Sequence, residues 1–250
     1  MSTIADDALR VISNRLEIDA GRFRTAHVIV DEGPSSVVDR AIRISSLPRD
    51  GYQRADWLEL LFSHELTHLL VRDTWGTGPV LWWEGLPVHL GDDRVRTRLF
   101  GHSYHAYCRA LDQLDALLPL EPLLQASTFY RRRADIRVDL QAGSFCGFLL
   151  ETLGPRRLGA FLTDYRRPTR ADPRMLLDPI TKQHLGDDFA GLAEGWIGFL
   201  RARVPCEPEL VDRLRTRTFG LEPDRREHCD FCFAPRSSDR ACPCPDAGEP

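Results

Sequence analysis

The sequence predicts an α+β domain that is predominantly helical and carries a small β-sheet near its N-terminus. Apolar residues recur at helical spacing through most of the 250-residue chain. Two short β-favouring runs, Ala26 to Val30 and Arg40 to Ser45, precede the longest helical pattern. A content of 42% hydrophobic and 28% charged residues is typical of one sizeable globular domain.

The N-terminal elements follow from local patterns. Residues 4 to 20 place apolar positions between charges and predict one amphipathic helix. The second β-favouring run alternates Ile42 and Ile44 with arginines, as in a half-buried strand. Asp50, with Gln53 three residues later, is predicted to cap the helix that follows.

The rest of the chain predicts further helices that complete a main domain over residues 1 to 204. The glycine-rich stretch from Gly76 to Pro79 should end the long helix. The expected later elements are helices over residues 96 to 118, 141 to 153, 155 to 166 and 188 to 203, a proline-broken turn over 117 to 124 and a surface loop over 166 to 178.

The stretch from Leu60 to Val71 contains the pattern H-E-x-x-H. On a helix, residues four positions apart lie on one face, so His64 and His68 can direct their imidazoles at a single cation. The predicted helix is apolar around much of its circumference, which indicates burial, and buried histidines need partners. A catalytic zinc site keeps one position open for water, and Glu65 is placed to remove the proton from it.

A pair of histidines on one helix supplies only two ligands. Fifteen residues separate His68 from Glu84, which lies in the stretch Trp82-Trp-Glu-Gly85. Together with H-E-x-x-H, this stretch resembles the gluzincin metallopeptidases, in particular the peptidase MA-like group. The resemblance implies a thermolysin-like zinc-peptidase domain in which Glu84 is the third zinc ligand. His89 and His102 are weaker alternatives.

Two features depart from that family pattern. Relatives tend to carry alanine where this chain has Pro87, and proline is tolerated only in the first turn of a helix, so the helix is expected to begin near Glu84. Many relatives also carry a tyrosine that stabilises the transition state, about where Asp139 stands here. The tyrosines that can substitute for it are Tyr104, Tyr107 and Tyr130.

The resemblance covers about residues 40 to 203 and implies a zinc-dependent peptidase with Glu65 as general base and a peptide or protein as substrate. It also implies that Arg40 to Ser46 is an edge strand that pairs with the substrate. The Gly-x-Met-Glu-Asn strand of aminopeptidases is absent, which favours an endopeptidase. Two alternatives stay open: an inactive zinc-binding pseudopeptidase that serves as an interaction module, and a metal-free helical scaffold.

Residues 205 to 250 form a separate, cysteine-rich tail in this interpretation. Its two close pairs are Cys229 with Cys232 and Cys242 with Cys244. Four such thiolates can form a second, structural zinc site, because a segment without a core needs a covalent or metal link. A disordered or disulfide-linked tail is the alternative.

Composition limits the expected partners. The net charge of −4 and the lack of a long basic stripe make nucleic acid an unexpected partner. The cluster Arg131 to Arg133 is interpreted as a solvated face in preference to an anion site. The N-terminus lacks a secretory pattern and no segment approaches eighteen apolar residues, so we expect a cytoplasmic protein that does not interact with membranes.

Overall fold

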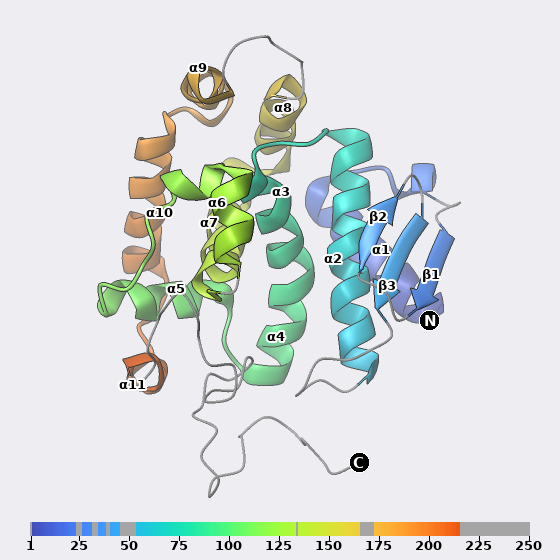
Figure 1. Cartoon of the computed structure of the whole chain (residues 1–250), viewed down its shortest axis with the longest axis horizontal. Helices are drawn as coiled ribbons and strands as arrows, with labels where there is room; N and C mark the ends of the chain where they lie inside the picture. The colour runs from blue at the N-terminus through green and yellow to red at the C-terminus, as the bar shows by residue number, and fades with distance from the viewer. Residues whose placement is uncertain are drawn as a thin grey trace, which may run out of the picture.

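The computed structural model describes residues 2–23, 27–31, 35–38, 41–45, 54–133, 135–165 and 173–215. This part of the chain is mostly helical and has one small three-stranded sheet, which confirms the predicted α+β class (Figure 1). None of the described helices combines the length and apolar character needed to cross a lipid bilayer.

The elements of the N-terminal half are α1 (Ser2–Leu16), η1 (Ala20–Phe23), β1 (His27–Asp31), β2 (Ser36–Val38), β3 (Ala41–Ser45), α2 (Arg54–Thr74), α3 (Val80–Pro87), η2 (Val88–Asp92) and α4 (Asp93–Phe100). Those of the C-terminal half are α5 (Tyr104–Gln113), η3 (Glu121–Leu124), α6 (Ala126–Arg132), α7 (Arg137–Leu153), α8 (Pro155–Tyr165), α9 (Pro173–Leu185), α10 (Phe189–Arg203) and α11 (Pro208–Arg215).

The sheet has the strand order β1-β3-β2, with β3 parallel to β1 and antiparallel to β2. The expectation that Arg40 to Ser46 is an edge strand is therefore wrong, since its described part, Ala41–Ser45, lies in the centre of the sheet. The pattern did not predict β2, because three residues are too few to show an alternation. Ile42 and Ile44 of β3 are fully buried, and the strand packs against α2.

Helix α2 lies between two groups of elements. The sheet and α1 pack on one side of it, and α3 with η2 packs on the other (Figure 1). Leu66, Leu69 and Leu70 are accordingly buried, which explains why the helix is apolar around most of its circumference. The predicted capping pair, Asp50 and Gln53, lies outside the described residues.

Elements α3, η2 and α4 form one helical run from Val80 to Phe100 with a π-turn in its middle. The predicted start near Glu84 is wrong, because Pro87 lies inside the helix with ordinary helical angles, φ −58° and ψ −42°. Proline there removes only the donor that would bond to the carbonyl of Trp83. The following turn is wider, since the N–H of Asp93 donates to the carbonyl of Val88, five residues earlier.

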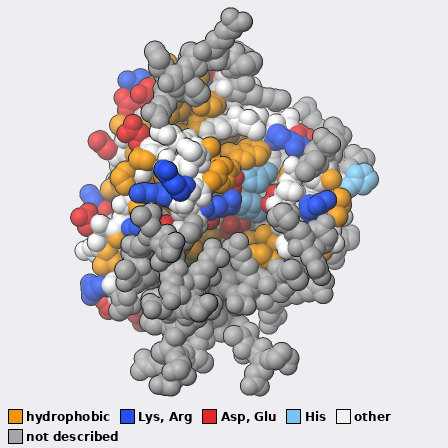
Figure 2. Space-filling model, viewed as in Figure 1, with side chains coloured by type: hydrophobic (Ala, Val, Ile, Leu, Met, Phe, Trp, Pro, Cys, Tyr) orange, Lys and Arg blue, Asp and Glu red, His pale blue; other side chains and the backbone are white. Residues whose placement is uncertain are grey.

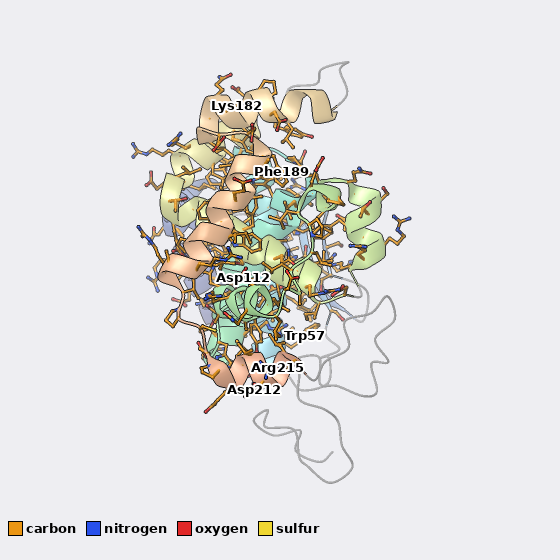
Figure 3. All side chains as sticks on the ribbon, turned by 90° about the vertical axis from the view of Figure 1, so that its left-hand side faces the viewer. Trp57, Asp112, Lys182, Phe189, Asp212 and Arg215 are labelled. Atoms are coloured by element: carbon orange, nitrogen blue, oxygen red, sulfur yellow. The ribbon has the colours of Figure 1, made fainter. Side chains whose placement is uncertain are left out.

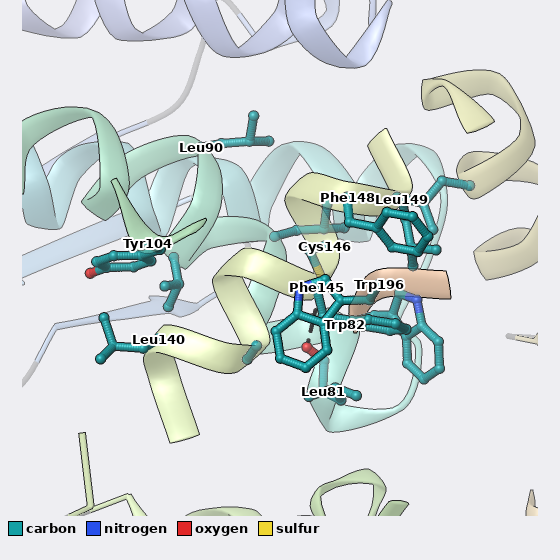
Figure 4. Packing of buried hydrophobic residues seen from close by; sticks show 14 of the residues in the cluster. Leu81, Trp82, Leu90, Tyr104, Leu140, Phe145, Cys146, Phe148, Leu149 and Trp196 are labelled. Atoms are coloured by element: carbon teal, nitrogen blue, oxygen red, sulfur yellow. Dashed lines mark hydrogen bonds between the residues drawn. The ribbon is translucent and has the colours of Figure 1, made fainter. Parts of the chain in front are cut away.

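Helix α7 is the centre of the second group of helices. It packs closely against α3, because a Cβ on Gly85 would lie only 2.5 Å from the carbonyl oxygen of Ala142. Trp82 of α3, Phe145 of α7 and Trp196 of α10 pack edge to face here, as Figure 4 shows. Large aromatic side chains in such contacts contribute strongly to the core.

Three predicted boundaries differ from the structure. The helix expected over residues 96 to 118 is two helices, separated at Gly101, whose φ of 78° favours glycine. The loop expected over 166 to 178 gives way to helix α9 from Pro173. Helix α11 lies beyond residue 204 and packs on α5 with three buried side chains, so packed structure continues to Arg215.

The C-terminal helices are tied together by charge as well as by packing. Figure 3 shows α9, α10 and α11 from the side, with Asp112 of α5 beside α10. The guanidinium of Arg201 donates to Asp112 through Nε at 3.0 Å and Nη2 at 2.8 Å. This bidentate contact fixes α10 against α5.

Candidate metal centre

Helices α2 and α3 bring three potential metal ligands together. Glu84 Oε2 lies 4.0 Å from both His64 Nε2 and His68 Nε2. All three side chains are buried, and within the described part of the chain this is the group whose ligand atoms converge, all within 4.8 Å of one another. Ligands of a tetrahedral zinc ion lie about 3.3 Å apart, so each carboxylate–imidazole distance would have to shorten by about 0.7 Å around an ion. The group can hold a metal ion.

His64 is oriented by a carboxylate from the π-turn. Its Nδ1 lies 3.0 Å from Asp92 Oδ1, which leaves Nε2 directed at the other ligands. Burial lowers the pKa of His64, but the nearby carboxylates, above all Asp92 and then Glu65 and Glu84, together outweigh this and raise the pKa to about 9. A carboxylate on the far nitrogen is the usual partner of a metal-bound histidine. Sequence reasoning missed Asp92, because the widened turn that places it there leaves no recognisable pattern.

His68 is held by packing. Its ring lies against the indole of Trp83, with centroids 4.4 Å apart and planes tilted by 37°. Burial lowers the pKa of His68 well below its usual 6.5. The ring is therefore neutral at neutral pH, which is the form that binds metal ions.

Glu84 is held by two side chains from the end of α6. Tyr130 Oη donates to Glu84 Oε1 at 2.8 Å, and Arg133 Nη2 lies 3.1 Å from Glu84 Oε2. Burial, together with the hydrogen bond to Glu84, raises the pKa of Tyr130 to about 12, so the phenol stays protonated. Of the three tyrosines considered from the sequence, the structure brings this one to the site, while Tyr104 and Tyr107 are buried in the core.

Two further carboxyl groups lie near the ligands. Glu65 is buried beside His64, and burial raises its pKa to about 7. Asp139, at the place where relatives carry a tyrosine, lies with Oδ1 3.7 Å from Arg133 Nε. Burial also raises the pKa of Asp139, to about 6.

The weaker ligand candidates lie elsewhere. His89 is directed towards α1, where its Nε2 lies 3.3 Å from Arg15 Nη2. The ring of His102 lies against that of Tyr107, with centroids 5.9 Å apart. Neither histidine belongs to the converging group. The four cysteines of the tail, Cys229, Cys232, Cys242 and Cys244, lie outside the described residues.

Histidine side chains are visible on one face of the molecule (Figure 2). Figure 2 shows histidine side chains at the centre of this face, set back between apolar and basic side chains. Comparison of the chain with protein-family models, with curated proteins and with solved structures gives no match.

Proposed function

We propose that the protein is a zinc-dependent metallopeptidase that hydrolyses an amide bond in a peptide. The observation that carries this proposal is the convergence of His64, His68 and Glu84 in a buried group beside Glu65. A long helix with both histidines, packed between a small sheet and a second helix with the glutamate, also suits the thermolysin-like arrangement implied by the resemblance to gluzincins.

The donor set suits zinc. Two imidazole nitrogens and one carboxylate are a common ligand set of catalytic zinc sites, which keep a fourth position for water or substrate. His64, His68 and Glu84 would hold the ion. Zinc, when bound, lowers the pKa of a water molecule and polarises the carbonyl of the substrate.

Glu65 is the proposed general base and acid. Its carboxylate takes a proton from the attacking water and later delivers it to the leaving amine nitrogen. Burial raises the pKa of this carboxyl, which makes it a stronger base toward the attacking water.

Tyr130 is the proposed donor to the negative charge that develops on the carbonyl oxygen. Its phenol stays protonated and lies at the edge of the ligand group, with 48% of its surface exposed. Loss of one such donor lowers the rate by about 10² to 10³ in comparable sites.

The inactive alternative rested on Pro87 and on the missing tyrosine. Pro87 continues the helix without displacing Glu84, and Tyr130 offers a phenol at the site. We therefore propose the active enzyme. We expect it to be an endopeptidase and to act in the cytoplasm.

The test combines metal content with peptide hydrolysis. The purified protein should contain one zinc ion at this centre, lost in Glu84→Ala, and should cleave members of a peptide library. Glu65→Gln should keep the zinc and lose activity, whereas Glu194→Gln, on an exposed position of α10, should keep both. Activity that survives in Glu65→Gln would refute catalysis by this residue.

A further inference from the structure

The described contacts place Arg133 at the rim of the metal centre. Its Nη2 lies 3.1 Å from Glu84 Oε2, and this same oxygen faces both histidines at 4.0 Å. The side chain of Arg133 is 41% exposed, whereas that of Glu84 is 6% exposed. The guanidinium thus lies between the buried ligands and solvent, where a substrate would enter.

Arg133 contacts its neighbours through one edge of its guanidinium, the edge formed by Nε and Nη2. Nη2 faces Glu84, and Nε lies 3.7 Å from Asp139 Oδ1. The ring of Tyr130 lies 6.0 Å from Cζ. In the described contacts no residue uses Nη1. The side chain is therefore held in place by its neighbours while one donor group still points away from them.

This environment differs from the solvated face predicted for Arg131 to Arg133. Arg133 is paired with two carboxylates at the metal centre, and Figure 2 shows basic side chains beside the histidines on this face. A held guanidinium with a free edge is suited to a carboxylate or a phosphate.

The surrounding charges favour the carboxylate over the phosphate. Four acidic side chains lie around the centre: Glu65, Glu84, Asp92 and Asp139. Their repulsion grows with the charge of the ligand, so a doubly charged phosphate is opposed more strongly than a singly charged carboxylate.

We propose that Arg133 binds a carboxylate of the substrate close to the bond that is cleaved, so that the preferred substrates are acidic at this position. The proposal rests on the peptidase function proposed above and names its substrate class. The carboxylate has two chemical sources: the C-terminus of a short peptide, or an aspartate or glutamate side chain within a longer one.

The test uses peptide binding to the zinc-loaded Glu65→Gln variant, in which the ligand is not consumed. N-acetylated tetrapeptides are prepared as two sets of matched pairs. In the first set the members of a pair differ only in having a free or an amidated C-terminus. In the second set they differ only in having glutamate or glutamine at an internal position. We expect the carboxylate member of one set to bind about tenfold or more tightly than its neutral partner. The set that shows the difference identifies the source of the carboxylate.

The variant Arg133→Gln, added to Glu65→Gln, should remove this preference and leave binding of the neutral member unchanged. Arg133→Lys should retain part of the preference. Arg131→Gln makes the same change of charge at an exposed position of the same helix and should retain all of it. Zinc content is measured in every variant, since Arg133 contacts a ligand residue.

The outcomes separate the two proposals. Equal binding of all matched pairs, or an equal loss for both members in Arg133→Gln, overturns the role of Arg133. Hydrolysis by the unmodified protein without any preference leaves the peptidase standing and removes the carboxylate site. A carboxylate preference without hydrolysis of any peptide keeps the site and rejects the peptidase.

Discussion

The metal ligands are held by side chains that contact them from other elements. Asp92 contacts His64, while Tyr130 and Arg133 contact Glu84. Such contacts fix the direction of a ligand and so reduce the cost of closing the site around an ion. His68 differs, since the described contact that orients its ring is with the indole of Trp83.

Asp92→Asn should weaken zinc binding by about 10- to 100-fold. The neutral amide lacks the negative charge with which the carboxylate stabilises the imidazole of His64 when that ring binds a cation. Competition with a chelator of known affinity measures this change. Asp73→Asn, at an exposed position of α2 away from the ligands, serves as the control and should bind zinc normally. Equal affinities in the two variants would mean that Asp92 does not support His64.

Asp93 predicts a pH dependence of stability. Burial raises its pKa from 3.8 to about 6, although its Oδ1 accepts the N–H of Tyr104 at 2.6 Å. The folded state therefore binds this proton more tightly than the unfolded state. Its contribution to stability is fully present below about pH 4 and is lost as the pH rises through about 6.

Asp93→Asn should remove this loss, because the amide oxygen can still accept from Tyr104 and carries no charge. Between pH 4 and pH 7 the unmodified protein should lose up to about 3 kcal/mol of unfolding free energy relative to the variant. Urea unfolding at several pH values measures the difference. Parallel curves would show that Asp93 ionises in the folded protein as freely as in the unfolded chain.

At the scale of elements, the π-turn η2 connects the metal centre to helix α2. Asp92 lies in this turn, and Gly91 beside it packs directly on α2. A Cβ at Gly91 would lie 2.7 Å from the backbone nitrogen of His64. The close approach that places Asp92 on His64 therefore requires glycine at this position.

Gly91→Ala should push η2 away from α2, destabilise the protein by about 1–3 kcal/mol and weaken zinc binding. Gly198→Ala is a matched control, since a Cβ there meets nothing within 4 Å. It should leave zinc binding unchanged and stabilise helix α10 by up to about 1 kcal/mol. Thermal unfolding and zinc titration follow the two effects, and similar behaviour of both variants would argue against close packing at Gly91.

Elements with a long apolar period were predictable from the sequence, and elements set by packing were not. The helices around His64, over α7 and over α10 agree with their predicted positions within a few residues. Strand β2 and the first turn of α3 were missed. A three-residue strand has no period of its own, and Pro87 suggested a helix start near Glu84, whereas the helix begins at Val80 and continues through the proline.

At the scale of the whole molecule, the packing of α11 shows that the packed part of the chain continues at least to Arg215. Leu210, Val211 and Leu214 are buried against the rest of the protein. A chain that ends at Arg215 should keep the metal centre and unfold at nearly the same temperature as the full chain. A chain that ends at Val204 should lose several kcal/mol, since each buried apolar side chain contributes about 1.5–3 kcal/mol.

The same pair of truncations tests the cysteine tail by its zinc content. One zinc ion in the chain ending at Arg215 and two in the full chain would support the tetrathiolate site predicted for Cys229, Cys232, Cys242 and Cys244. One zinc ion in both would assign the metal to His64, His68 and Glu84 alone. Equal stability of the two truncated chains would contradict the proposed role of α11.

The sequence by itself determined the helical class, the small sheet and the pairing of His64 with His68, because these depend on spacing within one element. Tertiary structure decided which other groups meet them. Asp92, Tyr130 and Arg133 come from separate turns and helices, and their positions depend on how closely those elements pack. Distances between elements depend on the volumes of the residues that meet at each contact, including glycines. The pattern of residues along one segment does not reveal which residues of another segment it will meet.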